Sequence, residues 1–261
     1  MQAEQVQTIN DSPDIIIRDI RITEPMIREY GDGTDEPLRY LHYDNKLAFG
    51  LQLEGIMEGR ISEAADVSRL AQFYTSFNRA VRVGDSIEIQ AWNRNENGGR
   101  KLRVNVLKNG EGEPCLESTM IYMPQLDGPE EELHGEPYTL TKDDLTKVQI
   151  GIAAPMDGNA YPLALGLASK PLVKLGMNGD LVKRLEKETP IYVKHRIEIY
   201  EAAQSLHVGD TVHFRPKILK QEKRDVTAQV ECFIGIGRKV YKIEMDLKMI
   251  PRKVLQAVLA R

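Results

Sequence analysis

"VRVGDSIEI" (81–89) and "LHVGDTVHF" (206–214) are two versions of one short phrase. In each, Val-Gly-Asp leads into a run in which apolar and polar residues alternate, and Asp210 follows Asp85 at a distance of 125 residues. Gly-Asp is typical of a turn, and alternation with a period of two is typical of a strand with one buried face. The 261-residue chain is therefore expected to contain one structural unit twice, with Asp85 and Asp210 as turn residues.

The segments that follow each phrase also match in kind. Alternation continues over 102–106 and 115–122 in the first half and over 226–234 and 241–249 in the second, and the last runs end in "YMP" and "MIP". Turns rich in Gly and Asn, "NENGG" and "GIG", separate these runs. This pattern predicts three or more antiparallel strands in each half, with one face of the sheet in water.

Upstream of each phrase the apolar spacing becomes helical. The stretch "NKLAFGLQLEGIMEGRISEAADVSRLAQFY" (45–74) predicts a central helix, with apolar residues at helical spacing from Met57 to Tyr74. Its counterpart is "YPLALGLASKPLVKLGMNGDLVKRLEKE" (161–188), which Asn178-Gly179 interrupts. Gly50 and Gly166 occupy matching places and are expected to be glycines at which helix packs on sheet.

The two halves have similar openings and a clear linker. Helical segments are expected to begin at Thr23 and Thr141, and "PQLDGPEEELHGEPYTL" between the halves is rich in Pro, Gly and Glu. We therefore divide the chain into an N-terminal domain (1–126, after a loose polar tail of about 14 residues), a linker (127–137) and a C-terminal domain (138–261).

Composition excludes several classes of protein. Hydrophobic residues make up 41% of the chain and the net charge is −4 without a clustered basic face, which disfavours a nucleic-acid partner. No apolar run approaches the length of a membrane span, and the N-terminus does not resemble a secretory signal, so a cytoplasmic protein is expected. Cys115 and Cys232 are expected to be buried free thiols, since no spacing of cysteine and histidine suggests a metal site.

The whole pattern resembles the hotdog fold in its double form, an α+β architecture in which each repeat wraps an antiparallel sheet around a central helix. It is most similar to the MaoC-like hydratases and dehydratases, whose motif D-x-N-P-x-H-x-D precedes that helix. The stretch "LHYDNKLA" (41–48) matches the end of the motif through His42, Asp44 and Ala48, and Gly59 follows where the family has a helix-start glycine.

The resemblance implies a reversible interconversion of 3-hydroxyacyl and 2-enoyl thioesters, with coenzyme A or acyl carrier protein as part of the substrate and no cofactor or metal. His42 and an aspartate would hold a water, and backbone N–H groups at the helix start would polarise the thioester carbonyl. The catalytic aspartate would be Asp35 or Asp32. Gly59, Asp44 and Glu36 are the candidates for substrate binding, and Glu36 could also serve as the carboxylate.

This chain departs from the family motif in its front part. Asp35 precedes His42 by seven residues instead of the usual five, and the usual Asn is absent. At the place of His42 the second half has Gly158, so one site per chain is expected, in the N-terminal half, with the second half helping to form the acyl tunnel. The remaining histidines have no partner spacing that suggests a role. The resemblance is compatible both with a chain that is a sufficient unit and with a homodimer.

Two other functions remain open from sequence. Hotdog thioesterases often use a carboxylate on or before the central helix, and Glu54, Glu58 and Glu63 are candidates for that role. A non-catalytic acyl-binding or scaffold protein is the third hypothesis, since fold alone does not define activity. It predicts a narrow cleft or the absence of a convergent acid and base.

Overall fold

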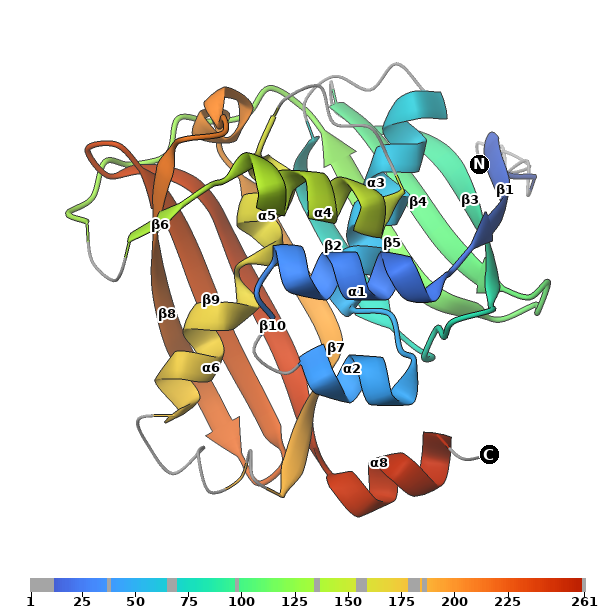
Figure 1. Cartoon of the computed structure of the whole chain (residues 1–261). Helices are drawn as coiled ribbons and strands as arrows, with labels where there is room; N and C mark the ends of the chain where they lie inside the picture. The colour runs from blue at the N-terminus through green and yellow to red at the C-terminus, as the bar shows by residue number, and fades with distance from the viewer. Residues whose placement is uncertain are drawn as a thin grey trace, which may run out of the picture.

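The computed structural model describes residues 12–36, 39–64, 70–96, 99–133, 137–153, 159–177, 184 and 187–259. The strands of the first half are β1 (Ile15–Arg21), β2 (Leu70–Phe77), β3 (Ser86–Glu96), β4 (Gly99–Lys108) and β5 (Pro114–Tyr122). Those of the second half are β6 (Pro137–Thr139), β7 (Glu188–Ile199), β8 (Thr211–Glu222), β9 (Asp225–Ile234) and β10 (Arg238–Pro251). All pair antiparallel in one sheet, whose curve around the helices is visible in Figure 1.

The strand order confirms the internal repeat. It is β1-β3-β4-β5-β2 in the first half and, read from the other edge, β6-β8-β9-β10-β7 in the second. The halves join where 72–76 of β2 pair with 194–198 of β7. The predicted linker ends at Pro137, which is already the first residue of β6.

The repeated Val-Gly-Asp phrases form the same turn twice. Gly84 and Gly209 have φ of +93° and +98°, a left-handed backbone that favours glycine. The next side chain closes each turn: Oδ2 of Asp85 accepts from the N–H of Arg82, and Oδ2 of Asp210 accepts from the N–H of His207, both at 2.8 Å. The prediction that both aspartates are turn residues is confirmed.

A short helix opens each half at the predicted threonine. Thr23 caps α1 (Glu24–Gly33) and Thr141 caps α4 (Lys142–Ile152), each through its side-chain oxygen. The two helices lie side by side across the joint between the halves (Figure 1). Glycine permits this contact, because a Cβ on Gly151 would lie 2.6 Å from the Cβ of Tyr30.

The central helix of the first half is shorter than predicted. α3 (Gly50–Ala64) packs inside the curved sheet, and by Leu70 the chain has entered β2. Ala71 and Tyr74, read as helical positions in the sequence, are strand residues with one buried and one exposed side chain. The segment "FYTSF" is rich in aromatic and β-branched residues, and burial of its alternate side chains stabilises a strand there.

The second helical segment is broken earlier than predicted. It forms α5 (Tyr161–Gly166) and α6 (Ser169–Met177), so the break comes at Leu167-Ala168, and Asn178-Gly179 lies outside the described residues. Pro171 lies in the first turn of α6, where its missing N–H costs nothing. The break brings the start of α6 to the joint between the halves.

The remaining named helices are short. Helix α2 (Arg39–Asn45) follows α1, and the 3-10 helix η1 (Glu201–Ser205) follows β7. The last described helix, α8 (Arg252–Leu259), lies beside α2. The Arg252 side chain reaches the Tyr40 hydroxyl on α2 at 3.0 Å. Apolar residues of both halves form one continuous core, in which Cys115 and Cys232 are buried free thiols, as predicted.

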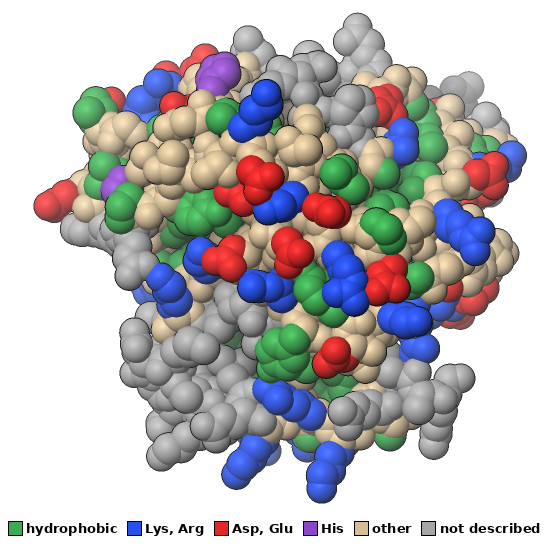
Figure 2. All heavy atoms as spheres, viewed as in Figure 1, with side chains coloured by type: hydrophobic (Ala, Val, Ile, Leu, Met, Phe, Trp, Pro, Cys, Tyr) green, Lys and Arg blue, Asp and Glu red, His purple; other side chains and the backbone are tan. Residues whose placement is uncertain are grey.

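Charges are interleaved on the face that carries α1, α2 and α4. Figure 2 shows acidic and basic side chains alternating across the middle of this face, and ion pairs such as Arg28–Glu24 and Lys147–Asp143 account for part of the pattern. Among the described helices, none has the length and apolar character needed to cross a membrane.

Candidate active site

A cavity lies at the joint between the two halves, and both halves line it. The first half contributes Glu36, His42 and Phe49 among others, and the second contributes Ser169 and Tyr192. Its deep wall is apolar and comes from helix α6 and the strands of the second half: Leu172, Ile218, Val226, Ala228, Leu247 and Met249. The cavity holds about 80 Å³, which is room for several water molecules or a slender chain.

His42 lies on α2 with its ring against the cavity. The ring stacks on Phe49 with centroids 3.9 Å apart, and its Nδ1–H donates to the carbonyl of Leu47 at 3.1 Å. Burial lowers the pKa of His42 to about 4, and hydrogen bonds to the backbone of Leu47 and Ala48 offset this only in part. The imidazole is therefore neutral at pH 7, with Nε2 as the nitrogen able to accept a proton.

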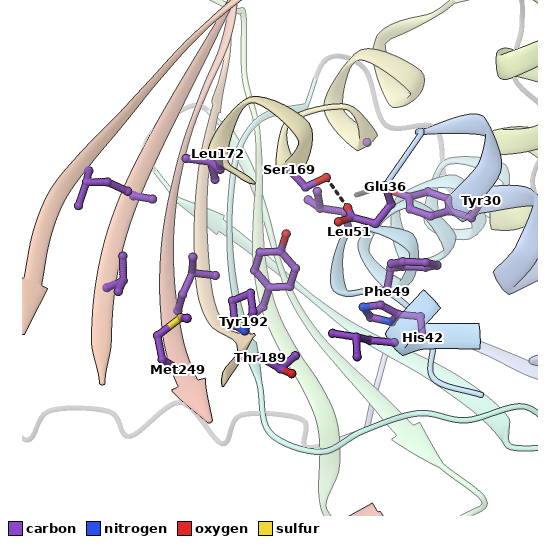
Figure 3. A pocket seen from close by; sticks show the side chains of 17 residues that line it. Tyr30, Glu36, His42, Phe49, Leu51, Ser169, Leu172, Thr189, Tyr192 and Met249 are labelled. Atoms are coloured by element: carbon purple, nitrogen blue, oxygen red, sulfur yellow. Dashed lines mark hydrogen bonds between the residues drawn. The ribbon is translucent and has the colours of Figure 1, made fainter. Parts of the chain in front are cut away.

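Among the described residues that line the cavity, Glu36 is the one that carries a carboxyl group. The residue is 8% exposed, and its Oε2 accepts a hydrogen bond from the hydroxyl of Ser169 in the second half. Figure 3 shows Glu36 and His42 entering the cavity from the same side, with Phe49 between them, opposite Tyr192 and Thr189. A carboxyl group and a neutral imidazole thus face one space.

Asp32 and Asp35, the predicted catalytic aspartates, are not on the cavity wall. Asp32 accepts a hydrogen bond from the Tyr43 hydroxyl at 2.8 Å, and Asp35 pairs with Arg39 and Lys170. Burial raises the pKa of Asp35, but the two cations outweigh it and hold the pKa below its usual value. Both side chains are about half exposed, so the structure brings Glu36 rather than either aspartate to His42.

The start of α3 lies at the cavity, because Leu51 in its first turn is a lining residue. The N–H groups of the first turn have no partner four residues back, and the helix dipole adds positive potential there. Gln52 fixes this end: Oε1 accepts from the N–H of Phe49, and Nε2 donates to the carbonyls of Met26 and Gly151. The arrangement suits a carbonyl oxygen that gains negative charge.

Gly59 and Asp44 do not line the cavity. Gly59 lies nine residues after the start of α3, so the expectation that the helix begins at Gly59 is wrong. The helix begins at Gly50. A Cβ on Gly50 would lie 3.2–3.3 Å from the rings of Phe77 and Tyr192, which confirms its packing role. Asp44 is exposed on α2 and does not line the cavity.

Strand β7 contributes two side chains that sequence reasoning missed. The Thr189 hydroxyl is buried on the cavity wall without a hydrogen-bond partner among the described residues. Burial raises the pKa of Tyr192 well above its usual value, and the charges of Glu36 and Glu54 add to this effect, so its hydroxyl stays protonated. Both can donate to a bound polar group, and neither carried a motif.

A second acid–imidazole pair lies behind this wall. Nδ1 of His195 lies 3.0 Å from Oε2 of Glu54, with both side chains fully buried, and the rings of Phe77 and Tyr192 pack edge-on against the imidazole. The sequence around His195 suggests no role for it, because its partner is 141 residues away on α3. The pair joins the two halves.

The glutamates considered for a thioesterase do not reach the cavity. Glu54 is occupied by His195, and Glu63 pairs with Arg60 on the exposed side of α3. Burial, together with the charge of Glu54, raises the pKa of Glu58 to about 7, yet Glu58 is not a lining residue. Within the described residues no cluster of three His, Cys, Asp or Glu side chains could hold a metal ion.

Comparison with known proteins identifies the fold. No family model and no curated protein matches the chain. A protein of Mycobacterium tuberculosis described as a double hotdog is similar with a TM-score of 0.62 at 10% identity, over 92% of this chain and 97% of that one.

Two further solved structures are similar at 12% identity. A putative MaoC domain dehydratase from Chloroflexus aurantiacus matches with a TM-score of 0.57, over 94% of this chain and 99% of that one. A putative thioesterase from Novosphingobium aromaticivorans matches with a TM-score of 0.54, over 77% and 87%. The chain is therefore an α+β protein of the double-hotdog fold, as predicted.

Proposed function

We propose that the protein is an acyl-thioester hydratase/dehydratase, resembling the MaoC-like family, with one active site at the joint between its halves. The observation that carries the proposal is the neutral imidazole of His42 and the carboxyl group of Glu36 on one cavity wall. The solved structures with this fold include proteins described as MaoC-like dehydratases, which supports the choice of chemistry.

In this mechanism Glu36 and Nε2 of His42 both contact one water molecule in the cavity. Its oxygen bonds to C3 of the enoyl thioester while the pair takes one of its protons, and the electron pair of the double bond moves toward the thioester oxygen. The first turn of α3 stabilises that negative charge. The pair then delivers the proton to C2, so the net change is addition of H and OH across the double bond. Dehydration is the reverse.

The wall opposite the pair suits the substrate's acyl part. Leu172, Val226 and Met249 are apolar and the cavity is narrow, so an unbranched hydrocarbon fits better than a polar or bulky group. The thioester carrier, either coenzyme A or acyl carrier protein, would remain near the mouth of the cavity.

The proposal is tested by following loss of the conjugated enoyl absorbance of crotonyl-coenzyme A and of a longer enoyl thioester. We expect hydration by the wild type and a loss of at least about 100-fold in His42→Ala. Asp44→Asn is the matched control, since Asp44 is on the same helix but exposed, and it should retain activity.

Release of free thiol without hydration would instead indicate a thioesterase. Tight binding of an acyl thioester without turnover of any kind would indicate an acyl-binding protein. Either result would overturn the proposal.

A further inference from the structure

Two neighbouring residues of the first half are held by two neighbouring residues of the second. The Glu36 carboxylate accepts from the Ser169 hydroxyl, and the Asp35 carboxylate pairs with the Lys170 ammonium. The inner contact is buried on the cavity wall, while the outer one is half exposed.

The backbone at the end of α1 explains why the side chains of Asp35 and Glu36 point in different directions. The N–H of Glu36 donates to the carbonyl of Gly31 at 2.9 Å, and the N–H of Asp35 donates to that of Asp32 at 3.3 Å. These two bonds form a Schellman motif, whose C′ residue is normally glycine. Here the residue is Asp35, with φ of 45°, so the chain reverses at a residue whose side chain can still bind Lys170.

A non-glycine residue is strained in this left-handed conformation. The Asp35 side chain pairs there with Lys170 and Arg39. The result is a rigid reversal that directs the next side chain, Glu36, into the cavity.

We propose that Ser169 is a positioning residue for the reaction, which fixes the orientation and the charge of the Glu36 carboxylate from the opposite half of the chain. A carboxylate removed from water needs hydrogen-bond donors, and a hydroxyl that donates to its ionised form favours that form. Ser169 is 3% exposed and opens α6, so it is held in place by the second half. This inference rests on the proposed hydratase function, and it makes the second half a contributor to the chemistry as well as to the acyl wall.

The kinetic test compares Ser169→Ala with Ser169→Thr. The alanine variant should lose about 10- to 100-fold in kcat with KM changed less than about threefold, since the carboxylate acts in the transition state. The acid limb of its pH–rate profile should move to higher pH, because Glu36 without the donor holds its proton longer. The threonine variant keeps the hydroxyl and should recover most of the rate.

Lys170→Met is the matched control. It removes the outer contact to Asp35 but leaves the Ser169 hydroxyl, so the acid limb should move less than it does in Ser169→Ala. Equal effects of Ser169→Ala and Lys170→Met on the rate, with no movement of the acid limb, would reduce Ser169 to a structural contact and overturn the inference.

A second measurement does not depend on turnover. The Glu36 side-chain carboxyl is titrated by NMR in protein with 13C-labelled glutamate, with Glu36→Gln to assign the signal. The titration midpoint should be higher in Ser169→Ala than in the wild type, and an unchanged midpoint would contradict the inference. Absence of hydration in the wild type would count against the proposed function, while this titration would still decide the role of Ser169.

Discussion

His42 is the residue on which the proposed chemistry depends most. Its Nδ1–H is committed to the Leu47 carbonyl, and the ring is stacked on Phe49. The site therefore selects one tautomer and keeps the ring uncharged across the physiological range of pH. A histidine with the ordinary pKa of about 6.5 would be about one quarter protonated at pH 7.

This environment predicts how the His42 ring titrates. By NMR of 15N-labelled histidine, the ring should be in its Nδ1–H tautomer at pH 7 and should titrate near pH 4. Since the unfolded chain takes up this proton near pH 6.5, the stability linked to His42 is full above that pH and is lost as pH falls toward 4. Titration at the ordinary pKa would show that the ring is not buried as described.

The sequence indicates His42 and leaves its acidic partner open between Asp35, Asp32 and Glu36. The H-x-D spacing marks the histidine, and the family motif favours an aspartate as the carboxylate. The structure favours Glu36, because the chain reverses at Asp35. The reversal turns the Asp35 side chain toward solvent and the Glu36 side chain into the cavity. Such a reversal at a non-glycine residue leaves no clear signal in sequence. Ser169, Thr189 and Tyr192 were missed because each comes from the half that lacks the motif.

At the scale of elements, the joint between α3 and β7 depends on the buried pair Glu54–His195. Removing one partner should leave the other buried without compensation, so His195→Leu or Glu54→Leu alone should each cost about 3–5 kcal/mol in the free energy of unfolding.

The double variant, with both residues changed to Leu, should cost clearly less than the two single changes together. Urea unfolding of the four proteins measures this coupling. Additive costs would mean that the two side chains do not act as a pair.

The crossing of α1 and α4 depends on glycine. In Gly151→Ala the new Cβ would lie 2.6–2.9 Å from Cβ, Cα and N of Tyr30, and backbone cannot move aside cheaply. We expect a loss of about 1–3 kcal/mol, measured by thermal or urea unfolding. Gly112→Ala is the control, since a Cβ there meets nothing within 4 Å, and its stability should change by less than about 0.5 kcal/mol.

Elements were predicted well where local chemistry decides them. Both Val-Gly-Asp turns and both threonine caps lie where the sequence placed them, because glycine at positive φ and a capping hydroxyl are local requirements. The end of α3 and the start of β2 were misread, because Ala71 and Tyr74 fit a helical period as well as a strand. Strand β1 is not predicted from the sequence, because its alternation is short.

At the scale of the whole molecule, the repeat explains both the fold and its asymmetry. Two units with the same strand order share one sheet, and the cavity that holds the candidate site lies where they join and is lined by both halves. The first half supplies Glu36 and His42, while the second supplies the apolar wall and Ser169. The segment 154–158, which contains Gly158, lies outside the described residues.

The central claim is that Glu36 and His42 act together on one substrate, and it is tested most directly by a double-mutant cycle on enoyl-thioester hydration. Rates are measured for the wild type, His42→Ala, Glu36→Gln and the double variant. We expect each single change to remove most of the activity and the double variant to be little worse than the weaker single one, because the groups work as a unit. Full activity in Glu36→Gln, or effects of the two changes that simply multiply, would contradict the account.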